Sequence, residues 1–285
     1  MRDSLLRFIP SWLLIFYQKH WKKSGWFGNY ATWQAAENDC DGYDSAAITA
    51  RVVEATRQVR DGKAAFERDS VLFFEEELDK PLLTILAKIR SEKGEKGEKA
   101  LIVLDFGGAL GSTYWQHRRV FEAWNIQWIV VEQTHFVEIG QSEFENAQLK
   151  FAFSIEEICL KMQPDIILFN SVLQYLETPY VFVDMAKKHH ILAIFVGRTP
   201  TFEGENDRIT QQIVPPKIYK ASYPSWVFSS NYFEKQLTKN TKYTIDWALN
   251  TPYSIYEING KQLFLSDVFL MKNTSISTNP DQYRV

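Results

Sequence analysis

The chain has 285 residues and a nearly balanced charge, with 32 Lys and Arg against 35 Asp and Glu and a formal net charge of −3 at pH 7. Apolar residues make up 45% of the chain and aromatic residues 15%, which excludes a disordered or collagen-like protein and allows one large or two modest domains. The charge balance argues against a protein built mainly to bind nucleic acid. Two cysteines, Cys40 and Cys159, are too few for a disulfide framework or a zinc site, so a reducing, cytoplasmic location is expected.

The first 25 residues are predicted to form a basic, aromatic helix. Their apolar run, residues 5–17, is interrupted by Arg7 and Pro10 and is too short for the ~20 apolar residues of a membrane-spanning helix. Most basic residues follow the run, which is the reverse of a secretory signal. Two interpretations stay open: a helix packed on the domain body, and an interfacial helix that contacts the inner face of the membrane.

A charged, glycine-containing stretch over residues 91–99 is predicted to be a solvated linker. Before it, apolar residues at helical spacing predict helices over 46–59 and 72–89. We therefore expect a helical cap over residues 26–98, followed by a second domain over residues 99–285.

Beyond the linker, short and continuous apolar runs replace the helical spacing. They occupy residues 101–104, 128–131, 151–153, 166–169 and 191–196. Such runs are typical of strands buried on both faces, and the stretches between them are long enough for crossover helices. Near the C-terminus, strands are expected over 243–249, 253–258 and 261–271, with a hairpin turn at Asn259-Gly260. The pattern predicts an α/β fold with a Rossmann-like, doubly wound, mainly parallel sheet that ends in antiparallel strands.

The first of these strands leads into a glycine-containing loop, Asp105-Phe106-Gly107-Gly108-Ala109-Leu110-Gly111. Glycines directly after a strand allow a sharp turn and a close approach of a ligand to the backbone. The spacing of these glycines does not match the dinucleotide-binding fingerprint. A carboxylate at Asp105 would repel a pyrophosphate and attract an ammonium group.

The Asp-x-Gly-x-Ala-x-Gly pattern resembles motif I of the class I S-adenosylmethionine-dependent methyltransferases, from which the chain departs at Ala109. Glu132 follows the second strand, 21 residues after Gly111, where an acid can accept hydrogen bonds from both ribose hydroxyls. The segment after the fourth strand continues the resemblance. It implies S-adenosylmethionine as the cofactor, bound by Asp105, Gly107, Gly108, Ala109, Gly111, Glu132, Gln133, Ser154, Asn170 and Ser171.

The N-terminal half resembles a narrower family of methyltransferases that is associated with bacterial surface-polysaccharide genes. The residues that carry this resemblance are Trp26-Phe27-Gly28-Asn29-Tyr30, Trp33, Gly42-Tyr43-Asp44-Ser45 and Phe66-Glu67-Arg68-Asp69-Ser70. It extends over nearly all of residues 26–272. It implies a small-molecule or glycan-like acceptor and favours O-methylation in glycan biosynthesis.

Methyl transfer from a sulfonium is an in-line displacement, so positioning and exclusion of water can supply most of the rate. A hydroxyl nucleophile also needs a base within hydrogen-bonding reach. The catalytic candidates are His117, Asp207 and Arg198. The sequence contains no metal-binding motif, so no metal site is expected.

Residues 198–233, beyond the fifth strand, are rich in aromatic and acidic side chains and are predicted to form a substrate lid. Aromatic rings beside carboxylates suit the apolar faces and hydroxyl edges of a sugar. The substrate-contact candidates are Tyr43, Glu67, Arg68, Asp69, Tyr175, Tyr223 and Trp226. The alternatives are a surface excursion for the lid and an ordinary salt-bridged helix start for residues 67–69.

Two other functions compete with a methyltransferase. A non-catalytic subunit that keeps the fold and binds a membrane or a biosynthetic partner is favoured by Ala109 and by the lack of an obvious base. A nicotinamide oxidoreductase is disfavoured by the glycine spacing and by Asp105.

Overall fold

The computed structural model describes residues 24–42, 45–93, 100–215, 221–239, 241–258 and 261–273. Most of the predicted N-terminal helix and Tyr43 lie outside these ranges. Within them, no helix is both long and apolar enough to cross a membrane.

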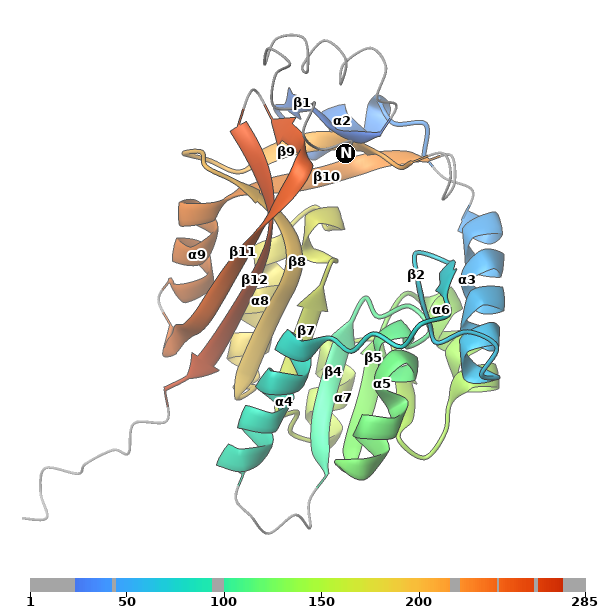
Figure 1. Ribbon diagram of the computed structural model, residues 1–285. Helices are drawn as coiled ribbons and strands as arrows, with labels where there is room; N and C mark the ends of the chain where they lie inside the picture. Colours follow the sequence, from blue (N-terminus) through green and yellow to red (C-terminus); the bar gives the residue numbers. More distant parts are fainter. Residues whose placement is uncertain are drawn as a thin grey trace, which may run out of the picture.

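The centre of the protein is a parallel sheet. Its strands are β4 (Leu101–Phe106), β5 (Ile126–Val131), β6 (Leu149–Ala152), β7 (Ile166–Asn170) and β8 (Ala193–Phe202), in the spatial order β6-β5-β4-β7-β8. β12 (Lys261–Lys272) pairs antiparallel with both β8 and β11 (Tyr243–Ile258). The prediction of a mainly parallel, Rossmann-like sheet with antiparallel C-terminal strands is therefore confirmed (Figure 1).

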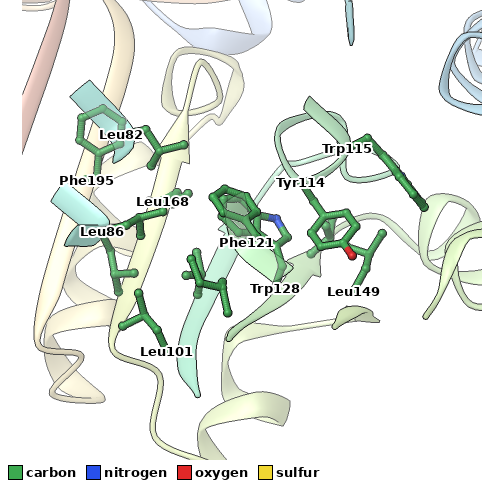
Figure 2. Packing of buried hydrophobic residues seen from close by; sticks show 14 of the residues in the cluster. Leu82, Leu86, Leu101, Tyr114, Trp115, Phe121, Trp128, Leu149, Leu168 and Phe195 are labelled. Atoms are coloured by element: carbon green, nitrogen blue, oxygen red, sulfur yellow. The ribbon is translucent and has the colours of Figure 1, made fainter. Parts of the chain in front are cut away.

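Helices cover both faces of this sheet, which is why its strands are almost continuously apolar. One face packs against α4 (Lys80–Glu92) and α5 (Ser112–Ala123), and Figure 2 shows Leu82 and Leu86 of α4 in the same cluster as Phe121 and Trp128. The other face packs against α7 (Ile155–Lys161), α8 (Pro179–Lys188) and α9 (Ser230–Thr238). α4 thus belongs to the core of the sheet domain, although the sequence placed it in a separate cap.

The strand order reverses beside β4. From β4 the chain passes through α5 to β5, and then through α6 (Thr134–Ile139) and the π-helical turn η2 (Gly140–Phe144) to β6, whereas β7 lies on the opposite side of β4. Ligands of open α/β sheets bind at such a reversal, beyond the carboxyl ends of the strands. A Cβ on Gly107 would lie 2.5 Å from Cγ2 of Val172, so the loops after β4 and β7 are in contact here.

The N-terminal part differs from a purely helical cap. It contains β1 (Gly25–Tyr30), α2 (Trp33–Asn38), α3 (Ser45–Arg60) and the short hairpin of β2 (Phe66–Arg68) and β3 (Val71–Phe73). The predicted helix over 72–89 begins only at Lys80, because the hairpin and a connecting loop precede it.

In its described residues, the segment predicted to form a lid consists largely of strands. β1 pairs antiparallel with β9 (Arg208–Ile213), and β9 pairs antiparallel with β10 (Ser222–Ser229). β10 then joins the central sheet through parallel pairing with the end of β8. Figure 1 shows this three-stranded unit beyond the carboxyl ends of β4 and β7, with α2 beside it.

Asp165, just before β7, connects this strand to β4 and to the end of α4. Its Oδ2 accepts hydrogen bonds from the Ile102 backbone N–H at 2.8 Å and from Lys93 Nζ at 2.7 Å. The side chain is largely buried, so its removal would leave a buried N–H without a partner.

We predict that Asp165→Ala lowers the free energy of unfolding by about 2–3 kcal/mol, measured by urea denaturation. Glu177→Ala, at an exposed position, is the matched control and should change it by less than about 0.5 kcal/mol. Equal effects of the two substitutions would contradict the anchoring role of Asp165.

Candidate cofactor and acceptor site

The loop after β4 takes a left-handed backbone at three positions. Gly107 has φ 77°, Ala109 has φ 50° and Gly111 has φ 84°. Glycine adopts this region freely, whereas an alanine there costs about 1–2 kcal/mol. The departure of Ala109 from the methyltransferase pattern is therefore accommodated by strain, and the loop keeps the turn of a glycine-rich motif.

Asp105 lies beneath this loop. Its carboxylate accepts a hydrogen bond from Trp128 Nε1 at 3.1 Å, and a Cβ on Gly108 would lie only 2.3 Å from its Oδ2. Burial raises the pKa of Asp105 to about 7; the negative charge of Glu132 adds to this effect and the Trp128 bond opposes it. Only 2% of the Asp105 surface is exposed, so this side chain supports the loop from inside the protein and is not exposed at the carboxyl edge of the sheet.

Glu132 joins the end of β5 to the same loop. Burial raises the pKa of its carboxyl, while hydrogen bonds from the backbone N–H groups of Gln133 and Ala109 lower it. The bond from Gln133 N measures 2.6 Å. Two predicted cofactor residues, Glu132 and Ala109, are thus brought into contact at the sheet edge.

The neighbouring candidate Ser154 has a different place. Its hydroxyl accepts a hydrogen bond from the Glu157 backbone N–H at 3.1 Å and caps the start of α7. Gln133 begins α6 as its N-cap residue and is exposed.

Two amide oxygens at and just after the carboxyl end of β7 have no partner in the described part of the chain. Asn170 Oδ1 and Gln174 Oε1 are buried and have no hydrogen-bond partner among the residues that the structure describes. Ser171 lies between them with φ 57°; its backbone N–H donates to Gly197 O at 2.8 Å and its hydroxyl accepts from Gln174 Nε2 at 3.1 Å. Buried acceptors of this kind cost about 1–3 kcal/mol each unless a ligand supplies a donor.

Gln174 is absent from the sequence-based candidates. The available signal was a polar residue within the otherwise apolar run Val172-Leu173-Gln174-Tyr175.

The β2–β3 hairpin docks on the glycine loop. Its two-residue turn has positive φ at both Asp69 (52°) and Ser70 (64°), as a type I′ turn requires. Glu67 accepts hydrogen bonds from the Ser112 hydroxyl and from the Ser70 backbone N–H. Because Ser112 begins α5 directly after Gly111, this contact holds Arg68 and Asp69 near the site, in a hairpin rather than at a helix start.

Aromatic side chains join the three-stranded unit to the segment after β7. Trp226 stacks on Trp33 of α2 at 6.2 Å between ring centroids, and its Nε1 donates to Leu176 O at 3.0 Å. Tyr175 and Tyr223 meet edge-to-face at 5.2 Å. Of the predicted contact residues, Tyr175 and Tyr223 therefore touch, and Trp226 is bonded to Leu176, the residue after Tyr175.

His117 is held in a structural contact. Its Nδ1 lies 2.9 Å from Thr113 O, and its Nε2 accepts a hydrogen bond from the Asp79 backbone N–H at 2.9 Å. The ring is buried, and burial lowers its pKa. Since Nε2 is engaged by the start of α4 and Nδ1 by the Thr113 carbonyl of its own helix, the geometry does not support the predicted role as a base.

Asp207 ties α8 to β10. It accepts hydrogen bonds from the Tyr180 hydroxyl at 2.7 Å and from the Ser229 backbone N–H at 2.8 Å. Tyr180 packs against the cluster on the α8 face of the sheet, so these contacts give Asp207 a structural role between α8 and β10. This position does not support a catalytic role either.

Arg198 is the one predicted catalytic residue at the carboxyl edge. It directly follows Gly197, which pairs with Asn170 at the end of β7. Burial lowers the pKa of its guanidinium and nearby Arg68 adds to that effect, whereas Asp69, Asp79 and Asp267 raise it. In the described part of the chain, no group of His, Cys, Asp and Glu side chains could hold a metal ion.

No family model and no curated protein matches the sequence. The similar solved structures include the N-terminal domain of EvdMO1 with SAH bound (11% identity, 81% of this chain and 98% of that chain, TM-score 0.43). They also include a Burkholderia thailandensis 1,6-didemethyltoxoflavin-N1-methyltransferase with bound 1,6-didemethyltoxoflavin and S-adenosylhomocysteine (14% identity, 80% of this chain and 94% of that chain, TM-score 0.38). A third is LepI in complex with SAM (10%, 66% and 46%, TM-score 0.45). All three TM-scores are below 0.5.

The raised pKa of Asp105 predicts a pH-dependent stability. The folded protein holds the Asp105 proton more tightly than the unfolded chain does. The protonated group therefore contributes its full amount to the free energy of unfolding below about pH 4, and this contribution is lost as pH rises through about 7. A shift of roughly 3 pH units corresponds to about 4 kcal/mol.

The Asp105→Asn variant keeps an acceptor for Trp128 but has no carboxyl to titrate. Between pH 4 and pH 8, we predict that its free energy of unfolding falls by about 4 kcal/mol less than that of the wild type. Urea denaturation at the two pH values measures the difference. Asp184→Asn, at an exposed residue, is the control and should follow the wild type. An unchanged pH dependence in Asp105→Asn would contradict the burial of a charge at this position.

Proposed function

We propose that the protein is an S-adenosylmethionine-dependent methyltransferase that acts on a small-molecule or glycan-like acceptor. The observation that carries this proposal is the contact of Glu132 with the left-handed loop at Ala109, at the point where the strand order reverses. An acid at the end of β5 beside such a loop suits a nucleoside whose ribose hydroxyls bind the carboxylate.

The residues present fit this cofactor. The backbone of Gly107, Gly108, Ala109 and Gly111 would approach it closely, and Glu132 would accept hydrogen bonds from the ribose. The unpartnered Asn170 Oδ1 offers an acceptor for a donor group of a ligand, and Ser171 lies beside it. When bound, S-adenosylmethionine supplies an electrophilic methyl group on its sulfonium.

The side chains of the protein then position the acceptor and exclude water, which suits an in-line displacement. Beyond the carboxyl end of β7 there are two aromatic pairs, Trp33 with Trp226 and Tyr175 with Tyr223. Rings of this kind can stack on the apolar faces of a sugar, which supports a glycan-like acceptor and O-methylation in glycan biosynthesis.

We predict that Glu132→Ala weakens binding of S-adenosylhomocysteine at least tenfold, about 1.4 kcal/mol or more, because it removes the ribose acceptor. Isothermal titration calorimetry measures this affinity. Glu122→Ala, at an exposed residue on α5, is the matched control and should bind as the wild type does. The site assignment fails if Glu132→Ala and the wild type bind equally.

A non-catalytic subunit that keeps the cofactor fold is the second candidate. The strained Ala109 and the engaged ring nitrogens of His117 favour it. Tight binding of S-adenosylhomocysteine, with no methyl transfer to any fraction of a cell extract, would support this function over catalysis.

We propose a cytoplasmic protein whose first 25 residues contact the inner face of a membrane, since they carry five Lys and Arg and one Asp. Flotation with anionic liposomes tests this. Replacing Lys19, Lys22 and Lys23 with Gln is expected to reduce the floated fraction. Equal flotation of this variant and the wild type would contradict the membrane contact.

A further inference from the structure

Arg198 is a partly buried cation that the proposed function leaves without a role. Its side chain makes no hydrogen bond or ion pair with any residue of the described ranges, whereas its backbone N–H donates to Asp267 Oδ1 at 2.7 Å. A guanidinium taken partly out of water without a carboxylate partner is costly, which points to an anionic ligand.

The backbone directs this side chain out of the regular sheet. Thr199 pairs with Ser266 and Val196 with Val268, so Gly197 and Arg198 both oppose Asp267 in a β-bulge. Arg198 has φ 52°, which is unfavourable for a residue with a side chain. β-Bulges beside active sites change the direction of side chains in this way. Backbone strain is retained at positions where that direction is needed for function.

Arg68, on the docked hairpin, is the second cation near this point. Its guanidinium lies over the Phe66 ring at 5.5 Å and has no ion pair within the described residues. Its neighbour Glu67 is bonded to Ser112 after the glycine loop, and Arg198 follows Gly197, which pairs with Asn170 at the end of β7, so both arginines come from segments at the carboxyl edge of the sheet. The charge of Arg68 also acts on Arg198.

The carboxylates near Arg198 are Asp69, Asp79 and Asp267. Asp79 accepts the Leu82 backbone N–H at 3.0 Å as the cap of α4, and Asp267 accepts the backbone N–H of Arg198. These two are therefore engaged with amide groups, and neither forms an ion pair with the arginine side chains. Asp69 lies at the exposed tip of the hairpin.

We propose that Arg198 and Arg68 together bind an anionic group of the methyl acceptor, a carboxylate or a phosphate. Arginine presents paired N–H donors that match either group bidentately. β8 is two strands from β4, or about 10 Å at the usual spacing, so the pair lies beside the glycine loop on the side away from Glu132. The identity of the ligand as the acceptor rests on the proposed function.

The test is isothermal titration calorimetry at constant ionic strength on protein saturated with S-adenosylhomocysteine, with inorganic phosphate and malonate as separate probes. We expect the preferred probe to bind at least tenfold more weakly to Arg198→Gln and to Arg68→Gln. Arg198→Lys, which keeps the charge but not the paired donors, should be intermediate. Arg119→Gln, whose side chain is 80% exposed, is the control and should match the wild type.

Equal probe affinities in the wild type, Arg198→Gln and Arg68→Gln would overturn the arginine site. A loss of S-adenosylhomocysteine affinity in Arg198→Gln as large as its loss of probe affinity would overturn the acceptor assignment, because Arg198 would then belong to the cofactor. If the wild type binds no S-adenosylhomocysteine, the proposed function fails by itself. In that case, the same titration on ligand-free protein still shows whether Arg198 and Arg68 bind the anionic probe.

Discussion

The buried carboxylate of Asp105 is the constraint on which the candidate site depends. It is bonded to Trp128 on the neighbouring strand and lies against Gly108, so it sets both the position and the residue type of the loop above it. The loop in turn presents the Ala109 N–H to Glu132. A carboxylate buried in this way favours its protonated form, and the site therefore combines a tightly fixed loop with a pH-sensitive support.

The N-terminal part completes the site instead of standing apart from it. Glu67 attaches the β2–β3 hairpin to the first residue of α5, and β1 supplies an outer strand to the sheet that contains β10. Both contacts bring residues from before the linker to the carboxyl edge of the central strands. The arginine pair is an example, because Arg68 comes from the hairpin and Arg198 from β8.

Much of the central fold could be predicted from the sequence, because its strands are buried on both faces and its crossovers are local in the chain. The loop over residues 105–111 and Glu132 could be found for the same reason. β1 could not, since its partner β9 lies far along the sequence and an isolated six-residue segment carries no signal for that pairing. The three-residue strands of the β2–β3 hairpin are too short to show a periodicity.

Side-chain roles were harder to predict than strands. His117 and Asp207 have residue types suited to catalysis, but their partners, the Asp79 and Ser229 N–H groups, are set by tertiary packing. The unpartnered oxygen of Gln174 likewise becomes visible only once its surroundings are known.

We propose that the carboxyl edge beside β4 binds S-adenosylmethionine. Thermal denaturation with S-adenosylmethionine, S-adenosylhomocysteine, NAD and NADP, each in turn, tests it most directly. A ligand that binds only the folded state stabilises it by about 2.7 kcal/mol at a hundredfold excess over its Kd. We expect a rise in Tm with the two adenosyl compounds alone. A rise with NAD or NADP, or no rise with any of the four, would contradict it.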